Sequence, residues 1–116
     1  MDIYHGFFSL KPGVKDTDFA DDMAKFMEYL VSKRKIASWR LMRRKLGLGP
    51  KELGEFHIMI EVENLSQLDD AFNLAAARKG DTESLHFSVN SRIADVSFAL
   101  YRDFPDPVRQ TGEELF

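Results

Sequence analysis

The sequence predicts an α+β domain in which one four-stranded sheet carries two helices on a single face. Its clearest strand is the stretch 55–63, in which two kinds of residue alternate strictly: Phe56, Ile58, Ile60 and Val62 lie between Glu55, His57, Met59, Glu61 and Glu63. A period of two places the two sets on opposite faces of an extended strand. One face is wholly apolar and the other is mixed, so the apolar face requires a covering layer.

The composition indicates one globular domain over residues 1–116, with a short tail at 105–116. The chain has 116 residues, of which 44% are hydrophobic, and this is enough for one two-layer core. The 16 basic and 19 acidic residues give a formal charge of -3, which argues against a nucleic-acid partner. The chain has no cysteine, no signal peptide and no apolar run long enough to span a bilayer. We expect a cytoplasmic protein without a membrane partner.

The first strand and the first helix are read from their spacing. Residues 3–11 alternate as a strand, and the sequence Lys11-Pro12-Gly13 ends it. Asp16 or Thr17 then caps a helix that extends to residue 35. Its apolar positions recur at helical spacing and predict a buried stripe: Phe19, Met23, Phe26, Met27 and Leu30. Basic residues at 33–35 complement the dipole at the end of this helix.

Residues 36–46 predict an edge strand, because basic residues occur on both of its faces. The cluster Arg40, Arg43, Arg44 and Lys45 has two interpretations, a phosphate site or a charged edge that prevents sheets from pairing; alternation splits it between faces, which favours the second. The glycine-containing segment 47–54 lacks the spacing of a nucleotide-binding loop and leads into a strand, so it is a hairpin connection.

The second half of the chain predicts a second helix and a last strand. Asn64 or Ser66 caps the helix, which ends at Arg78-Lys79-Gly80 with glycine just past its last turn. Segment 81–93 fits either a short helix or an extended chain, and the sequence leaves this open. Residues 95–104 alternate as a strand, which Pro105 ends.

The order strand, helix, strand, strand, helix, strand is that of the ferredoxin-like βαββαβ fold. We expect the first and third strands to be central and parallel, within a four-stranded antiparallel sheet. The helices cover the face formed by Tyr4, Phe8, Leu10, Phe56, Ile58, Ile60, Val62, Phe98 and Leu100. The other face carries Ile3, His5, Phe7, His57, Met59, Ala99 and Tyr101, with either Trp39 and Leu41 or Met42 from the edge strand.

This second face is too apolar to be left in water. Covering on the order of 1,000 Å² of it at ~25 cal/mol per Å² contributes about 25 kcal/mol, more than the ~4–15 kcal/mol cost of association. A second copy of the chain is the simplest partner, so we predict a homodimer.

With this element order, its length and its ending Leu100-Tyr101-Arg102-Asp103-Phe104-Pro105-Asp106-Pro107, the chain resembles the dimeric α/β-barrel superfamily and its small uncharacterised bacterial members. The resemblance implies that two sheets pack face to face into a barrel that encloses a pocket. Functions in that superfamily include cofactor-independent monooxygenases, small-molecule isomerases, haem-dependent enzymes and non-enzymatic stress or regulatory modules, so the resemblance implies a pocket more than a reaction.

A candidate catalytic cluster follows from the predicted barrel. Aligning the centres of the first and third strands places His5 beside His57, and the last strand brings Tyr101 close to His5. A histidine titrates near neutral pH and can act as the base, while the tyrosine donates to a developing oxyanion. The residues expected to contact the substrate are Phe7, Trp39 or Arg40, Met59, Glu61 and Ser97, with His86 and Asn90 over the barrel mouth.

Three functions remain open from sequence. The leading hypothesis is a barrel that binds a small aromatic or enolisable molecule, as a cofactor-independent monooxygenase or isomerase. The alternative is a non-enzymatic stress-response or regulatory dimerisation module, in which His5, His57 and Tyr101 only fill the interface. Haem or metal binding is the third, but no ligand spacing supports it and no cofactor is predicted. The sequence leaves open the substrate, whether the protein is an enzyme, and any higher oligomeric state.

Overall fold

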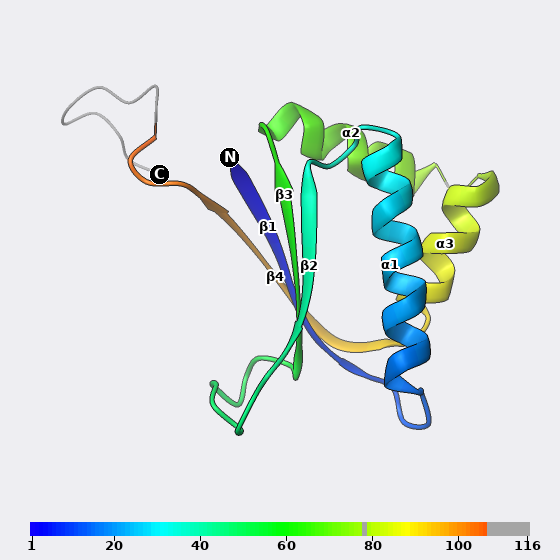
Figure 1. Ribbon diagram of the computed structural model, residues 1–116, viewed down its shortest axis with the longest axis vertical. Coiled ribbons are helices and arrows are strands. Elements are labelled where there is room, and N and C mark those ends of the chain that lie inside the picture. The colour runs from blue at the N-terminus through cyan, green and yellow to red at the C-terminus, as the bar shows by residue number, and fades with distance from the viewer. Residues whose placement is uncertain (78, 107–116) are drawn as a thin grey trace.

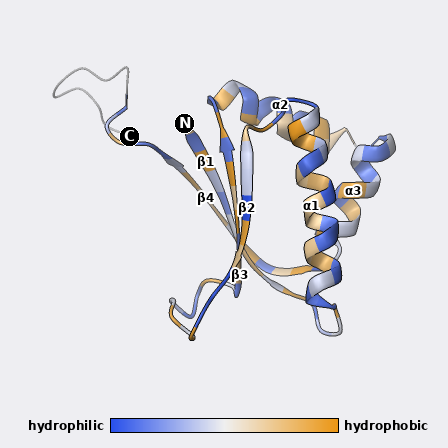
Figure 2. Ribbon diagram, in the orientation of Figure 1, coloured by the Kyte–Doolittle hydropathy of each residue, from blue (hydrophilic) through white to orange (hydrophobic). Residues whose placement is uncertain are grey.

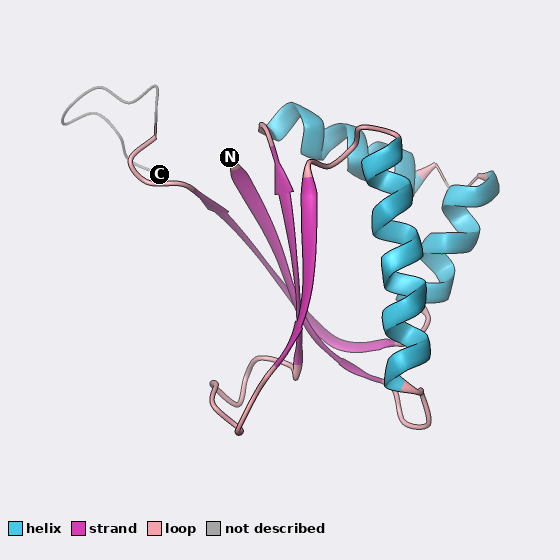
Figure 3. Ribbon diagram, in the orientation of Figure 1, coloured by secondary structure: helices cyan, strands magenta, loops and turns pink. Residues whose placement is uncertain are grey.

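A computed structural model describes residues 1–77 and 79–106 of the chain. Within them the elements follow the order β1 Asp2–Leu10, α1 Asp16–Ser32, β2 Ser38–Arg43, β3 Phe56–Val62, α2 Leu65–Ala76, α3 Gly80–Asn90 and β4 Ile93–Arg102. The helices all lie on one side of the sheet (Figure 1), and the two layers are separated clearly when coloured by secondary structure (Figure 3). The fold is the predicted ferredoxin-like one, with α3 as an additional helix before β4.

The sheet has the strand order β2-β3-β1-β4, and each neighbouring pair is antiparallel. The prediction that the first and third strands are parallel is therefore wrong. Helix α1 carries the chain back, so that β2 runs in the same direction as β1, and the hairpin loop 47–54 then reverses β3. Since β3 inserts between β1 and β2, it is antiparallel to both.

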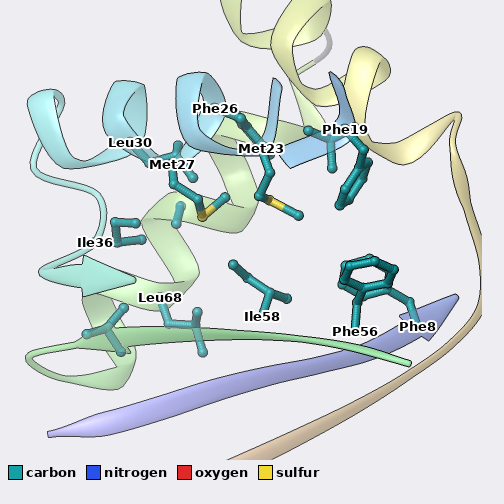
Figure 4. Close-up of a cluster of buried hydrophobic side chains, with 13 residues drawn as sticks. Phe8, Phe19, Met23, Phe26, Met27, Leu30, Ile36, Phe56, Ile58 and Leu68 are labelled. Atoms are coloured by element: carbon teal, nitrogen blue, oxygen red, sulfur yellow. The ribbon is translucent and has the colours of Figure 1, made fainter. Parts of the chain in front are cut away.

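The core lies between α1 and the helix-facing side of the sheet (Figure 4). All five residues of the predicted α1 stripe are buried: Phe19, Met23, Phe26, Met27 and Leu30. Phe19 is 0% exposed and its ring centroid lies 5.5 Å from that of Phe8, which in turn lies 5.8 Å from that of Phe56. The helical spacing in the sequence thus produces the apolar face that seals this side of the sheet.

The ends of α1 differ from the prediction. Lys15 precedes the helix and its side chain makes no capping hydrogen bond, whereas Asp16 and Thr17 lie inside the first turn. The helix ends at Ser32, so the basic residues 33–35 follow it instead of lying in its last turn. Arg34 adopts a left-handed conformation, with φ of 56°, and this turns the chain toward β2.

Helix α2 begins at a reciprocal cap. Asn64 accepts a hydrogen bond from the backbone N–H of Gln67 at 2.9 Å, and the Gln67 side chain accepts one from the backbone N–H of Glu63 at 2.8 Å. Of the two predicted caps, Asn64 is therefore the one used. The helix ends at Ala76, before the predicted end; Gly80, with φ of 54°, begins α3 instead. Of the predicted terminus, residue 78 lies outside the described residues.

The basic residues around β2 mostly support the fold. Arg43 donates to Asp16 at 2.8 Å and lies 3.4 Å from a carboxylate oxygen of Glu55. Arg44 donates to the backbone carbonyl of Leu53 at 2.8 Å and so holds the loop 47–54. These contacts explain why the cluster does not form one cationic patch. Arg40 points to the opposite face of the sheet.

Strand β4 extends past the helices at the edge of the sheet. Phe98 and Leu100 lie on the helix-facing side as predicted, yet they are 62% and 52% exposed. Arg102 donates to Asp2 and Asp106, and these hydrogen bonds raise the pKa of Arg102 above its usual range. Of the predicted tail at 105–116, residues 107–116 lie outside the described residues. No helix in the described ranges has both the length and the apolar character needed to cross a bilayer.

We expect Phe19→Ala to lower the free energy of unfolding by about 3–5 kcal/mol, because it removes a fully buried ring and leaves a cavity. Urea denaturation monitored by circular dichroism measures this change. The control is Leu48→Ala, at a side chain that is 77% exposed, which should change stability by less than about 0.5 kcal/mol. Equal effects of the two substitutions would contradict the assigned core.

Candidate functional site

The face of the sheet away from the helices is called the open face here. Directly paired residues of an antiparallel sheet share a face, so the strand registers define its members: Ile3, His5, Phe7, Ser9, Ser38, Arg40, Met42, His57, Met59, Glu61, Ser97, Ala99 and Tyr101. Colouring by hydropathy shows hydrophilic and hydrophobic segments along each strand, as the alternation predicts (Figure 2). None of the helices in the described ranges covers this face.

Two histidines meet in the middle of the open face. In the register of β1 and β3, His5 lies opposite Met59 and Phe7 lies opposite His57, so the histidines are diagonal neighbours. His5 Nδ1 lies 2.8 Å from His57 Nε2, which is a hydrogen bond between the two rings. The sequence analysis expected these two residues to be neighbours but assumed parallel strands. The expectation still holds, because the centres of β1 and β3 lie side by side in either strand direction.

Aromatic rings surround the histidine pair. The ring centroid of Phe7 lies 4.2 Å from that of His57, with the planes nearly parallel. The ring of Tyr101 meets His5 edge to face, with centroids 5.2 Å apart. Tyr101 itself is 65% exposed, so it forms the border of the cluster and not its centre.

The histidine pair favours the uncharged state. Partial burial lowers the pKa of His5, and partial burial together with the neighbouring His5 lowers the pKa of His57. In a neutral pair, one ring donates its N–H to the bare nitrogen of the other. When both rings are protonated, neither has an acceptor nitrogen and two cations face each other, so protonation breaks this hydrogen bond.

The other predicted contact residues on the open face are spread along its strands. Arg40 lies opposite Met59, Glu61 opposite Ile3, and Ser97 opposite Phe7. A hollow of about 240 Å³ lies at one end of this face, between Phe7, His57 and the loop 48–54, but it does not include His5 or Tyr101.

Trp39 does not belong to this face. It lies opposite Ile60 on the helix-facing side, and its indole N–H donates to Glu28 of α1 at 2.8 Å. The sequence left the two faces of this strand open, and the structure places Met42 on the open face, with Trp39 and Leu41 toward the helices.

His86 and Asn90 lie on the opposite side of the sheet from the predicted barrel mouth. Both belong to α3, one turn apart, and both line a cavity between the helices and the sheet. We call this space the inter-layer cavity. Their shared direction was predicted, but their expected position over the open face was wrong because α3 packs against α1 on the helix side.

The inter-layer cavity has a volume of about 200 Å³. Of its lining residues only Tyr4, His86 and Asn90 have a nitrogen or oxygen atom in the side chain. Gly6, Ala71 and Ala75 also line it; the two alanines present only methyl groups to the cavity, and Gly6 lets Ile58 approach the backbone of β1 closely. The alanines of α2 are plain in the sequence, but nothing in their spacing shows that they border a cavity.

Its three polar side chains make no hydrogen bond to any residue in the described parts of the chain. The ring of His86 lies 5.6 Å from that of Phe26. Tyr4 lies between Phe72, at 5.2 Å edge to face, and Phe98, stacked at 5.5 Å, and its burial raises the pKa of its hydroxyl. Tyr4 therefore stays protonated at neutral pH and is available as a donor.

The described residues contain no group of three or more His, Cys, Asp or Glu side chains placed to hold a metal ion. The two open-face histidines bond to each other, and His86 lies on the other side of the sheet. The histidine pair offers two imidazole groups with the phenol of Tyr101 at its border, and the inter-layer cavity offers one phenol, one imidazole and one amide group.

Comparison with family models gives one match over the complete sequence, residues 1–116, to a family of unknown function, DUF6614. The chain belongs to this family. No protein of curated function matches this DUF6614 chain.

Solved structures share the fold of the DUF6614 chain at low sequence identity. A protein from Arabidopsis thaliana has a TM-score of 0.71 at 7% identity, over 89% of this chain and 95% of its own. A dimeric ferredoxin-like protein of unknown function from Jannaschia sp. CCS1 has a TM-score of 0.60 at 13% identity, over 89% and 100%. SnoaB, a cofactor-independent oxygenase from Streptomyces nogalater, has a TM-score of 0.60 at 13% identity, over 97% of both chains. The fold is thus that of dimeric ferredoxin-like proteins.

The histidine pair predicts a specific pH dependence of stability. In the unfolded chain each histidine titrates near about pH 6.5. Because the folded-state pKa of both is lower, the unfolded state binds more protons as the pH falls below about 6.5, and the free energy of unfolding decreases through that range. Above that pH this contribution is fully present.

Urea denaturation at a series of pH values from about 8 to about 5 measures this contribution. The double variant His5→Gln, His57→Gln lacks the histidine contribution, so its free energy of unfolding should decrease less steeply than that of the unmodified protein. Some decrease should remain, because carboxyl groups titrate in both proteins. Parallel pH profiles would contradict a neutral, hydrogen-bonded pair.

Proposed function

We propose that this protein is a homodimeric α/β barrel in which each chain binds a small, largely apolar molecule in its inter-layer cavity. The observation that carries the proposal is the combination of an apolar lining with three hydrogen-bonding side chains, Tyr4, His86 and Asn90, that have no partner in the described residues. Ligand sites in proteins commonly have this composition, an apolar wall with a few polar groups that fix orientation.

The cavity also indicates the class of ligand. Its volume of about 200 Å³ is below the ~300–1,000 Å³ typical of sites for drug-sized molecules, which favours one or two rings. A hydroxyl or carbonyl group on the ligand could form a hydrogen bond with the His86 ring, which has none to the described residues. The phenol of Tyr4, protonated at neutral pH, would donate to an oxygen atom.

A second copy on the open face completes the barrel in this proposal. The half-buried histidines, Phe7 and Met59 then lie in the dimer interface, so His5 and His57 contribute packing and a hydrogen bond at that interface. Support comes from the dimeric description of structural neighbours such as the Jannaschia protein. The catalytic role first suggested for His5, His57 and Tyr101 is then less favoured than a site at His86.

The reaction that best fits this site is proton removal from an aromatic or enolisable molecule by His86. A neutral imidazole accepts the proton of the ligand, and Tyr4 donates a hydrogen bond to the resulting oxyanion. The electron-rich anion can react with O₂ without a cofactor: a CH₂ group becomes a carbonyl that keeps one oxygen atom, and the other leaves as water. The relation to SnoaB, an oxygenase that uses no cofactor, favours this over isomerisation.

Binding is tested with a matched pair of ligands, 1-naphthol and naphthalene, by fluorescence titration. We expect 1-naphthol to bind about fivefold more tightly, because its hydroxyl forms a hydrogen bond worth about 1 kcal/mol. His86→Phe should keep naphthalene binding and lose the preference for the naphthol. Absence of saturable binding of either compound would contradict the proposal.

The location of the ligand is tested with two alanines of α2. Ala75 lines the cavity, whereas Ala76 is exposed and does not. Ala75→Leu should therefore weaken binding of both compounds at least tenfold, as expected of about 1.4 kcal/mol or more of lost contact, and Ala76→Leu should leave it unchanged. Equal affinities in the two variants would place the ligand elsewhere.

The reaction is tested in an oxygen electrode with 1-naphthol, whose keto tautomer carries a CH₂ group at C4 that oxidation converts to the second carbonyl of 1,4-naphthoquinone. We expect one O₂ consumed for each quinone formed, at a rate above that in buffer, and a loss of at least about 10²-fold in this enhancement in His86→Phe, the usual contribution of a general base. A rate that is equal with and without protein, alongside intact naphthol binding, would favour the non-enzymatic binding module.

A further inference from the structure

Two residues of the open face have an acidic or strongly basic side chain, Arg40 on β2 and Glu61 on β3. Arg40 lies opposite Met59 and Glu61 lies opposite Ser38, so the two charges are diagonal neighbours on adjacent strands. Neither side chain forms a hydrogen bond or ion pair with any residue in the ranges that the structure describes. Arg43 and Arg102, by comparison, are both paired with carboxylates.

Such a pair of opposite charges suits an interface between two identical faces. In a two-fold symmetric dimer, each contact between two different positions occurs twice, so a face must be complementary to itself. A face with one cation and one anion meets this condition if the symmetry axis interchanges their positions. A face with charges of one sign would repel its own copy.

The sheet geometry shows where that axis would lie. For two sheets packed face to face, the axis runs between them and parallel to both. Neighbouring strands are about 4.8 Å apart, and positions two residues apart on a strand are separated by about 6.7 Å. If the sheet is drawn flat with these spacings, the two-fold axis that exchanges the positions of Arg40 and Glu61 projects onto it as a straight line. This line crosses β1 within about 2 Å of His5.

The axis set by the charges therefore passes through the middle of the apolar cluster. His5 belongs to a central strand, and the line continues toward Ser97 on β4. The two faces then overlap over their apolar centres, and the charges lie toward one border of the contact. Two independent requirements, burial of the aromatic cluster and pairing of the charges, agree on one arrangement.

We propose that a second copy of this chain packs on the open face in a register fixed by two symmetric ion pairs, each between Arg40 and Glu61 of the partner subunit. This inference rests on the homodimer of the proposed function and adds the residues that select the arrangement. Apolar contacts supply most of the association free energy. Charged pairs near the border of an interface mainly exclude other registers, because a misplaced charge would be left without a partner.

The test is a charge exchange followed by native mass spectrometry. Arg40→Glu places four acidic side chains at the two paired positions of its homodimer, and Glu61→Arg places four basic ones. We expect each variant alone to have a dissociation constant raised at least tenfold. In an equimolar mixture, one Arg40→Glu chain and one Glu61→Arg chain restore both pairs with opposite charges, so the heterodimer should predominate over either homodimer.

Two further variants serve as controls. The double variant Arg40→Glu, Glu61→Arg reverses both pairs and should form homodimers with an affinity near that of the unmodified protein. Lys25→Glu makes the same change of charge at an exposed site on α1 and should leave the dissociation constant unchanged. Recovery in the mixture also shows that both single variants fold.

The outcomes separate this inference from the proposal on which it rests. A monomeric unmodified protein would overturn the homodimer and the ion pairs together. An unmodified dimer whose single variants keep their affinity, or whose mixture shows no excess of heterodimer, would overturn the Arg40 and Glu61 pairing and leave the dimer intact.

Discussion

The structure depends on one constraint: the sheet has apolar residues on both faces, while the helices α1, α2 and α3 all cover the same face. Helix α1 seals the inner face with the stripe that includes Phe19 and Met27. On the other face, no helix or strand among residues 1–77 and 79–106 covers Phe7 and the hydrogen-bonded pair of His5 and His57. Burial of apolar area is the dominant favourable term in association, so this surface is the place where covering by a partner would gain the most free energy.

The same architecture separates assembly from ligand binding. The open face can be covered by a flat partner, because its aromatic and histidine side chains already contact one another and leave no enclosed space at its centre. The inter-layer cavity lies on the other side of the sheet, where Ala71 and Ala75 of α2 contribute only small side chains to its wall. Its polar side chains belong to β1 and α3, so the site lies within a single chain. The proposed dimer interface and the proposed ligand site therefore lie on opposite sides of the sheet and do not overlap.

The sequence was sufficient for most of the fold. Strict alternation in 55–63 and helical spacing in α1 identify the buried face of each element. In the strand, a shift of the pairing register by one residue would move every apolar side chain to the other face of the sheet. It was insufficient at β2, where Trp39 is amphipathic and pairs with Glu28 on a helix distant in sequence. Strand direction could not be read from spacing, which is identical for parallel and antiparallel neighbours. His86 was misplaced because its segment fits helix and strand equally, and only packing against α1 decides which side of the sheet it occupies.

Sedimentation equilibrium of the unmodified protein at micromolar concentration tests most directly whether the open face is covered by a second copy. We predict a single species with twice the mass of the chain, in which the two central strands are protected from solvent. A species with the mass of one chain at every concentration would contradict it, because the histidine pair and Phe7 would then face water in a stable monomer.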